Sequence, residues 1–286
     1  MKTVFLTGST GMLGQYVRDE FSGADYDVIA PTRAEYNLEA PATLDQLIIK
    51  AKPNIVIHLS AQTDVDLCER DPVLAMKMNS LSTQTIARAA KQTGAWLLYI
   101  SSSNVYGREG KSQYNELDIP GPLNYYGLSK LAGEAAIRET CGSDYCIVRA
   151  GWMIGGGRDR DHKFVGKLVK QIRGSADKLL AVDDKYGTIT PAYRLAKFVK
   201  SCADRRLTGL YHYASLGSVS RYDIAKVVAD HFEFKGKLIG VRSNVFPLSA
   251  PRPSFEGITT VHETAVFLDE EPNQWRDDLT DYISKF

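Results

Sequence analysis

Short apolar runs alternate with longer amphipathic stretches through the first half of the chain. Runs rich in branched or apolar residues occur at 2–7, 27–30, 55–59, 96–100 and 146–148. Continuous apolar strands of this kind are typical of a sheet that is buried on both faces. The stretches between them predict helices over 42–51, 73–92 and 126–140. This alternation predicts an α/β fold built on a right-handed, doubly wound parallel sheet.

Glycines follow the first strand without a spacer. Gly8, Gly11 and Gly14 form a Gly-x-x-Gly-x-x-Gly pattern directly before a helical stretch. Glycine allows a tight turn and a close approach of the backbone to a pyrophosphate, and the helix that follows offers unpaired N–H groups. The spacing departs from the Gly-x-Gly-x-x-Gly form of many dehydrogenases, so an ordinary strand-to-helix turn is the alternative. Its place after the first strand nevertheless predicts a Rossmann-type dinucleotide site.

The chain changes character after about residue 150. A glycine-rich, charged segment covers 155–161, and helices are predicted over 164–173, 193–204 and 221–232. Prolines at 247, 251 and 253 mark an irregular loop, because proline is disfavoured inside a helix. We therefore expect a dinucleotide-binding Rossmann domain at 1–150. Residues 151–286 should form a smaller α/β lobe, mainly for substrate binding, with some segments that return to the core sheet.

The residues after the second strand indicate which dinucleotide is bound. An NAD-selective site usually carries Asp or Glu there, to bind the ribose 2′-hydroxyl. This chain has no carboxylate before Glu35, and it places Thr32 and Arg33 at that point. A guanidinium can bind a 2′-phosphate through two hydrogen bonds. The sequence predicts a preference for NADP(H), with use of NAD(H) as the alternative.

The composition of the chain narrows the classes of molecule that it could bind. The 286 residues include 35 Lys plus Arg and 34 Asp plus Glu, without a long run of one sign, which argues against nucleic acid. No apolar stretch approaches the roughly 20 residues of a membrane span, and no basic and apolar leader precedes the first strand. Four dispersed cysteines suggest neither a disulfide framework nor a metal site. We expect a cytoplasmic protein that binds small molecules, without metal or membrane, and a homodimer is one option for its assembly.

Tyr-x-x-x-Lys occurs three times, at Tyr126, Tyr193 and Tyr222. The bare pattern carries little weight, because residues four apart share one face of any amphipathic helix. The Tyr126 copy follows a buried strand that ends in the serines 101–103. Ligands bind at the carboxyl ends of such strands, where a lysine ammonium would favour the phenolate form of a nearby tyrosine. Because of this context, we predict that Tyr126 and Lys130 are the functional pair among the three.

These motifs together resemble the extended short-chain dehydrogenase/reductases. The likeness is carried by the glycine pattern, by Ser-Ser-x-x-Val-Tyr-Gly at 101–107, and by Tyr-Gly-x-Ser-Lys at 126–130. The chain is most similar to the dTDP-4-dehydrorhamnose reductases. That closer likeness rests on 63–66, 122–134, 149–152, 164–165, 187–191 and 252–253, and so spans nearly the whole chain.

The resemblance implies the catalytic residues. Tyr126 would donate the proton, Lys130 would bind the nicotinamide ribose and tune Tyr126, and Ser102 would align with the family's Ser/Thr. Ser101 and Ser103 are close competitors, but Ser102 lies four residues before Tyr106, in the register of the family. The alternative is that one or two of these serines only satisfy backbone groups at the end of the strand.

Cofactor and sugar contacts are implied in the same way. The expected cofactor-binding residues are Gly8, Thr10, Gly11, Met12, Leu13, Gly14, Thr32, Arg33, Leu59, Ser60, Ala61 and Lys130. The expected substrate-binding residues are Thr63, Val65, Ser103, Asn104, Trp152 and Arg252. Trp152 would present a flat apolar face and an indole N–H donor to the sugar. Asn79 either helps to hold the active-site strand or is a solvent-facing amide.

The implied reaction is hydride transfer to the 4-keto carbon of a nucleotide-linked 6-deoxysugar. A 4-epimerase with the same Tyr, Lys and Ser, and a non-catalytic NADP-binding regulatory subunit, are the alternatives. Dehydration is disfavoured, because Ser103 and Asn104 replace the acid pair of the dehydratases. Ser102-Ser103-Asn104 also differs from the usual Thr-Asp-Tyr of the reductases, and 158–163 is unusually polar. Both differences leave the identity of the sugar open. His162, within the polar segment, is expected to be a solvated loop histidine rather than a diphosphate contact.

Overall fold

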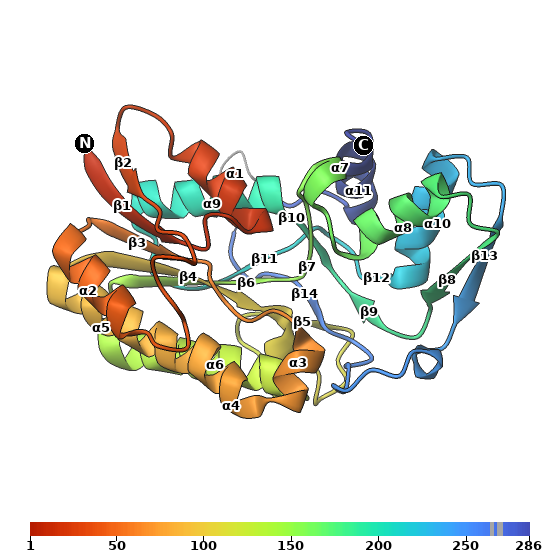
Figure 1. Ribbon diagram of the computed structural model, residues 1–286. Helices are drawn as coiled ribbons and strands as arrows, with labels where there is room; N and C mark the ends of the chain where they lie inside the picture. The colour runs from red at the N-terminus through yellow and green to blue at the C-terminus, as the bar shows by residue number, and fades with distance from the viewer. Residues whose placement is uncertain (264–265, 268–270) are drawn as a thin grey trace.

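A six-stranded parallel sheet forms the larger part of the molecule (Figure 1). The computed structural model describes residues 1–263, 266–267 and 271–286. In spatial order the strands are β11 (Gly209–Tyr213), β6 (Tyr145–Ala150), β4 (Trp96–Ser102), β3 (Ile55–His58), β1 (Lys2–Thr7) and β2 (Tyr26–Ile29). All neighbouring pairs run parallel. The predicted doubly wound Rossmann-type sheet is confirmed.

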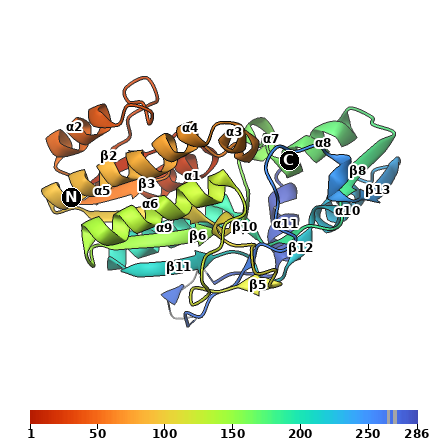
Figure 2. The ribbon, with the colours of Figure 1, turned by 90° about the horizontal axis from the view of Figure 1, so that it is seen from below.

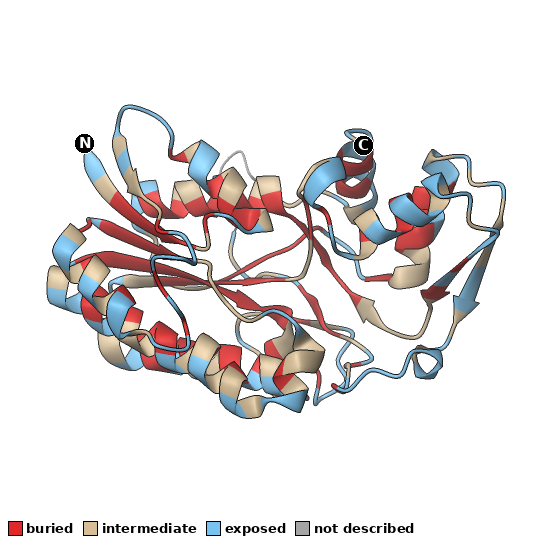
Figure 3. Cartoon of the chain, in the orientation of Figure 1, coloured by how far each residue is buried: buried red, intermediate tan, exposed pale blue. Residues whose placement is uncertain are grey.

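Helices cover both faces of this sheet (Figure 1). Helices α1 (Met12–Glu20) and α9 (Ala192–Arg205) pack together on one face, and α2 (Ala42–Ala51), α5 (Ser82–Thr93) and α6 (Tyr125–Cys141) pack on the other. Side chains alternate accordingly along β1: Val4 and Leu6 belong to the core under α1 and α9, and Phe5 belongs to the opposite core. The central strands are thus buried on both faces, as their continuous apolar runs predicted (Figure 3).

The helix predicted over 73–92 is present, but it contains a π turn that was not predicted. It runs without a break through α4 (Pro72–Met76), a π-helical turn at Lys77–Leu81 and α5. The π turn includes Asn79, whose side chain is buried rather than solvent-facing. A π turn adds a residue to the helical repeat and commonly occurs at functional sites. A short helix α3 (Val65–Arg70) precedes this group.

A smaller lobe lies at the carboxyl end of the sheet (Figures 1 and 2). It contains α7 (Gly157–Arg160), α8 (Phe164–Arg173), α10 (Arg221–His231) and α11 (Trp275–Ile283), with the parallel pair β8 (Lys178–Val182) and β13 (Lys237–Val241). Short pairs join β7 (Trp152–Ile154) to β10 (Ile189–Pro191), β9 (Tyr186–Gly187) to β12 (Val219–Ser220), and β5 (Gln113–Tyr114) to β14 (Gly257–Ile258). From this half of the chain, α9 and β11 return to the large sheet. The division at residue 150 stays a prediction.

The proline-containing segment links the two halves. It follows the 3₁₀ turn Ser243–Val245, contains no helix, and ends at β14, which pairs with β5. The irregular loop predicted from the three prolines is therefore confirmed. In the described part of the chain, no helix is long and apolar enough to cross a membrane.

The strand order reverses at β1, which lies between β2 and β3. At such a reversal the loops after two adjacent strands diverge to opposite faces and leave a crevice at the carboxyl edge. Here the loops that start at Gly8 and at Leu59 border that crevice. The fold therefore places the glycine loop at the position where this type of sheet binds ligands.

Candidate active site

A cavity of about 670 Å³ extends from the glycine loop to the small lobe. This size is within the range of small-molecule and cofactor sites. Most of the predicted site residues line it: Gly8, Thr10, Gly11, Met12, Leu13, Gly14, Arg33, Leu59, Ser60, Ala61, Thr63, Ser102, Asn104, Tyr126, Lys130 and Trp152. The other two Tyr-x-x-x-Lys pairs, on α9 and α10, do not line the cavity. The fold thus brings the glycine loop and the Tyr126 copy to one space.

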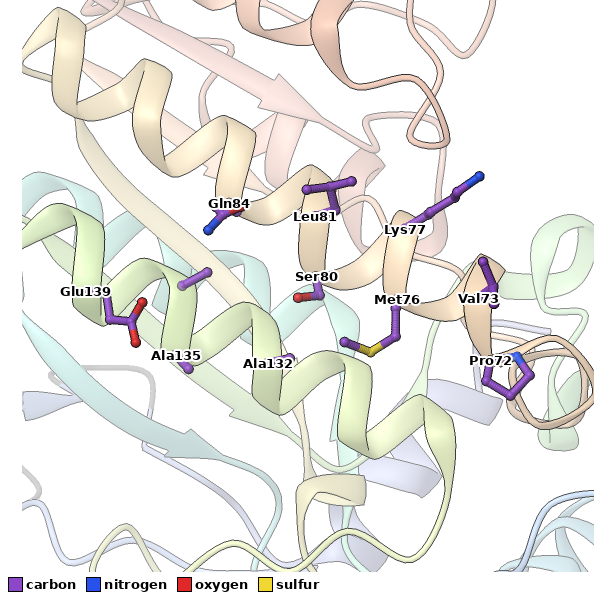
Figure 4. Close-up of a pocket in the computed structure, with 11 residues that line it drawn as sticks. Pro72, Val73, Met76, Lys77, Ser80, Leu81, Gln84, Ala132, Ala135 and Glu139 are labelled. Carbon is purple, nitrogen blue, oxygen red and sulfur yellow. The ribbon is translucent and has the colours of Figure 1, made fainter.

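A second hollow lies on the outer surface between α4, the π turn, α5 and α6 (Figure 4). Its lining is largely apolar and includes Val73, Met76, Leu81 and Ala132. None of the predicted catalytic, cofactor or sugar residues contributes to it. We therefore assign the candidate active site to the first cavity.

The glycine loop depends on missing side chains. A Cβ on Gly14 would lie 2.0 Å from the carbonyl oxygen of Gly8, and a Cβ on Gly8 would lie 2.9 Å from the backbone N of Ser60. Gly8 also has a φ of +74°, which favours glycine. Gly11 is the N-cap of α1 and is exposed, so its backbone is open to a ligand. The loop is therefore a compact cradle at a helix N-terminus, which suits a diphosphate.

Gly14→Ala is expected to destabilise the protein by about 1–3 kcal/mol, because the added methyl must displace backbone rather than a flexible side chain. It should also abolish dinucleotide binding, since the loop can no longer keep its shape. Urea unfolding and a nucleotide titration measure the two effects. The control is Gly23→Ala, where a Cβ has no neighbour within 4 Å; its stability should change by less than about 0.5 kcal/mol. Equal stability of the two variants would contradict the assigned role.

The three serines at the end of β4 have different partners. Ser101 donates a hydrogen bond to Glu134 at 2.6 Å, and Ser103 donates one to Glu256 at 3.1 Å. Ser102 lines the cavity, and its hydroxyl interacts with the phenol of Tyr126. Gly127 makes this proximity feasible, because a Cβ there would lie 2.0 Å from the carbonyl oxygen of Asn104. Among the three hydroxyls, that of Ser102 is the one positioned beside Tyr126.

Burial dominates the electrostatics of Tyr126 and Lys130. It raises the pKa of Tyr126 to about 12, although the hydrogen bond with Ser102 opposes that shift. It lowers the pKa of Lys130 to about 7, although the charge of Glu134 opposes that shift. The Lys130 ammonium donates to the carbonyl oxygen of Ile100 at 2.8 Å. The expected lowering of the Tyr126 pKa by Lys130 is therefore wrong for the protein without ligand.

Asn79 connects two walls of the cavity. Its amide accepts a hydrogen bond from the backbone N of Gln62 at 2.7 Å and donates to Ser129 at 3.0 Å. Gln62 follows β3, and Ser129 lies between Tyr126 and Lys130 on α6. Of the two expectations for Asn79, the buried, holding role agrees with these contacts.

Four predicted contacts do not line the cavity. Thr32 bonds to Glu35 through its backbone N–H and its hydroxyl, at 2.7 and 2.9 Å. Arg252 instead forms an ion pair with Asp66 at 2.9 Å and so anchors the proline-containing segment to α3. Val65 is the first residue of α3, and Ser103 is directed at Glu256. The side chains of Thr32, Ser103 and Arg252 are thus bonded within the protein and do not line the cavity.

Trp152 lines the cavity from the start of β7. Its indole N–H, which was expected to be available to a ligand, donates to Glu256 at 2.8 Å. The guanidinium of Arg221 lies 3.7 Å from the centroid of the indole ring. A Cβ on Gly187 would lie 2.5 Å from the ring, so glycine is needed to accommodate it. The indole is thus fixed by the protein before any ligand binds.

Sequence reasoning missed several residues of the site. Tyr36 lines the cavity; its hydroxyl accepts from the backbone N of Gly8 and bonds to Ser60 at 2.5 Å. Arg221 lines it from the start of α10, and Glu256 lies behind Trp152 and Asn104. No pattern in the sequence singled out Glu256. His162, as expected, is exposed and does not line the cavity.

Comparisons with known proteins agree with this geometry. Residues 1–286 match the family described as the RmlD substrate binding domain. The crystal structure of dTDP-4-dehydrorhamnose reductase from Yersinia enterocolitica is 49% identical, with a TM-score of 0.97 over 100% of both chains. The corresponding enzyme from Bacillus anthracis in complex with NADP is 26% identical, with a TM-score of 0.90 over 100% of this chain and 99% of that one. The dTDP-4-dehydrorhamnose reductase of Salmonella typhimurium is 28% identical over 90% of this chain and 89% of its own. The chain therefore belongs to the RmlD substrate-binding-domain family, and its resemblance to the dTDP-4-dehydrorhamnose reductases within the extended short-chain dehydrogenase/reductases is confirmed.

Proposed function

We propose that this protein is an NADPH-dependent reductase of the 4-keto group of a nucleotide-linked 6-deoxysugar, with dTDP-4-dehydrorhamnose as its substrate. The observation that carries the proposal is that Tyr126, Ser102 and Lys130 line the same cavity as the glycine loop. The relatives from Yersinia enterocolitica, Bacillus anthracis and Salmonella typhimurium, which are named as dTDP-4-dehydrorhamnose reductases, support it.

The residues present fit a dinucleotide phosphate. Gly8 and Gly14 leave a cradle that a Cβ would fill, and α1 begins immediately after it. Arg33 lines the same cavity and supplies the guanidinium for a 2′-phosphate. When bound, NADPH supplies the hydride. The bound NADP of the Bacillus anthracis relative supports the proposed preference for NADP(H).

The side chains at the other end of the cavity provide the proton. With a pKa raised to about 12, Tyr126 keeps its proton at neutral pH and can donate it to the carbonyl oxygen as that oxygen gains charge. Ser102 orients the same oxygen, and Lys130 holds the ribose of the cofactor. An ammonium that approaches Tyr126 in the complex would also stabilise the phenolate left after transfer.

A direct assay tests the proposal. Purified protein is incubated with NADPH and dTDP-4-dehydrorhamnose while absorbance at 340 nm is followed and the sugar is analysed. Loss of absorbance together with a reduced sugar is the expected result. Isomerised sugar without net oxidation of NADPH would favour an epimerase, and no reaction across several 4-ketosugars would favour a regulatory subunit.

Arg33→Ala is expected to weaken NADPH binding by about ten- to a hundredfold, because it removes a charge-assisted contact worth about 1.5–3 kcal/mol. NADH carries no 2′-phosphate, so its affinity should change little. Isothermal titration with both nucleotides measures the difference. Arg18→Ala, an exposed position on α1 outside the cavity, is the matched control. Equal losses for NADPH and NADH would contradict the assignment of Arg33.

We further propose a cytoplasmic location, because the four dispersed cysteines suit a reducing compartment. A homodimer is the assembly to be tested. Light scattering on the purified protein should then give twice the mass of the 31.7 kDa chain. A monomer mass would contradict the dimer.

A further inference from the structure

A buried carboxylate holds the sugar end of the cavity together. Glu256 is 5% exposed and accepts three hydrogen bonds from side chains: Asn104 Nδ2 at 2.6 Å, Trp152 Nε1 at 2.8 Å and Ser103 Oγ at 3.1 Å. These donors come from the 3₁₀ turn after β4 and from β7, whereas Glu256 itself directly precedes β14. One side chain thus joins three segments that are far apart in the sequence.

The bonds continue to the helix that carries Tyr126. Asn124, the N-cap of α6, donates to the side-chain oxygen of Asn104 at 3.2 Å and accepts from the backbone N of Gly127 at 2.9 Å. Asn104 therefore lies between Glu256 and the first turn of α6, and it also lines the cavity. The position of the carboxylate is coupled in this way to the wall that faces the reacting oxygen.

A cation lies beside this arrangement. The Arg221 guanidinium lies over the indole ring of Trp152. Burial raises the pKa of the Glu256 carboxyl, and the hydrogen bond from Trp152 and the charge of Arg221 oppose that shift. Trp152 is thus held by an acceptor at its N–H and by a cation on its ring, both from outside β7. A charged acceptor makes the stronger bond to an N–H, so replacement by a neutral amide should loosen the indole.

Ser103 also donates to this carboxylate, at 3.1 Å. We propose that Glu256 is a positioning residue that fixes Trp152 and Asn104 for recognition of the sugar. The proposal deepens the proposed function, since it concerns the sugar end of the same site. Glu256 does not itself line the cavity, so it acts through the two side chains it holds.

Glu256→Gln tests the proposal because it should change the KM for the sugar much more than kcat or the NADPH Kd. We expect the KM for the nucleotide sugar to rise about tenfold, kcat to change less than about threefold, and the NADPH Kd to stay within about twofold. Glu116→Gln is the matched control, because Glu116 is also a mostly buried carboxylate with three donors, His212 N, Thr260 Oγ1 and Val261 N, but lies outside the cavity. An unchanged sugar KM in E256Q, or an equal rise in E116Q, would overturn the proposal.

A second substitution distinguishes a specific role of the carboxylate from a general effect of the first substitution on packing. In the double variant E256Q/S103D a carboxylate is placed at position 103, whose hydroxyl lies 3.1 Å from the Glu256 carboxylate in the wild type. We expect the sugar KM of this variant to return most of the way to the wild-type value. An unimproved KM would overturn the idea that a carboxylate at this place holds the two side chains. Should E256Q fail to fold, E256D keeps the charge but is too short for all three donors; its sugar KM should rise, and a wild-type KM would be the refuting result.

A measurement without turnover keeps this inference separate from the proposed function. The chain has three tryptophans, so ¹⁵N labelling gives three indole N–H signals, of which W152F identifies that of Trp152. In E256Q the Trp152 proton should move upfield, while Trp96, whose N–H donates to the carbonyl oxygen of Leu207 at 3.0 Å, should not move. An unmoved Trp152 signal would overturn the positioning role even in an active reductase. A shifted signal in a protein inactive on ketosugars would uphold the role and refute only the proposed substrate.

Discussion

Replacement of Tyr126 by phenylalanine is expected to lower kcat for sugar reduction by about 10²- to 10⁴-fold, the usual contribution of a general acid. The reason is the pKa of about 12, which keeps the proton on Tyr126 at neutral pH and makes this phenol the donor available beside Ser102. NADPH affinity should stay within about twofold, because the ring remains and the cofactor contacts lie elsewhere. Stopped-flow reduction under single-turnover conditions and a fluorescence titration with NADPH measure the two quantities.

The neighbouring tyrosine supplies the control. Tyr125 is exposed, lies at the start of the same helix and does not line the cavity. Tyr125→Phe should therefore keep wild-type kcat and NADPH affinity. Wild-type turnover by Y126F would refute the acid role of Tyr126, and a similar loss in Y125F would show that the first turn of α6 is sensitive to any change.

Local sequence patterns were sufficient to predict the central sheet and the helices that cover it. Helix α2 has the predicted bounds 42–51, and β3 and β4 are buried on both faces, because periodicity and burial act over a few residues. The choice of Tyr126 among three similar pairs depended on the strand that precedes it. That choice agrees with its place in the cavity, since the carboxyl ends of parallel strands meet at one edge.

Errors arose where a side chain found a partner that the pattern did not indicate. Thr32 was expected to face a phosphate, but its hydroxyl donates a hydrogen bond to Glu35, three residues later. The π turn at Lys77–Leu81 adds one residue to the repeat within a continuous helix, a shift that was not recognised in the hydrophobic pattern. Glu256 is 104 residues from Trp152 in the sequence, and only the tertiary fold brings them together. Contacts of this range are decided by packing, which a single sequence does not specify.

The affinity for NADPH should fall as the pH rises above about 7, by up to about tenfold per pH unit, because of Lys130. Burial lowers the pKa of Lys130 to about 7 in the free protein, so its ammonium is lost over this range. Bound NADPH favours the ammonium through its negative charge and ribose hydroxyls, which raises that pKa in the complex. Binding at pH 8 should then take up a proton, which titration calorimetry in buffers of different ionisation enthalpy detects.

Neighbouring groups do not explain such a slope. Burial lowers the pKa of His58 to about 3, and the pKa of Tyr126 is about 12, so neither group titrates between pH 7 and 9. Lys130→Met should bind NADPH weakly and with a flat pH dependence, because it has no proton to gain. Lys130→Arg keeps its charge over the whole range and should also show a flat profile, at higher affinity than the methionine variant. A slope that persists in K130M would assign the proton to another group, whereas a flat wild-type profile would mean that Lys130 is already fully charged in the free protein despite its burial.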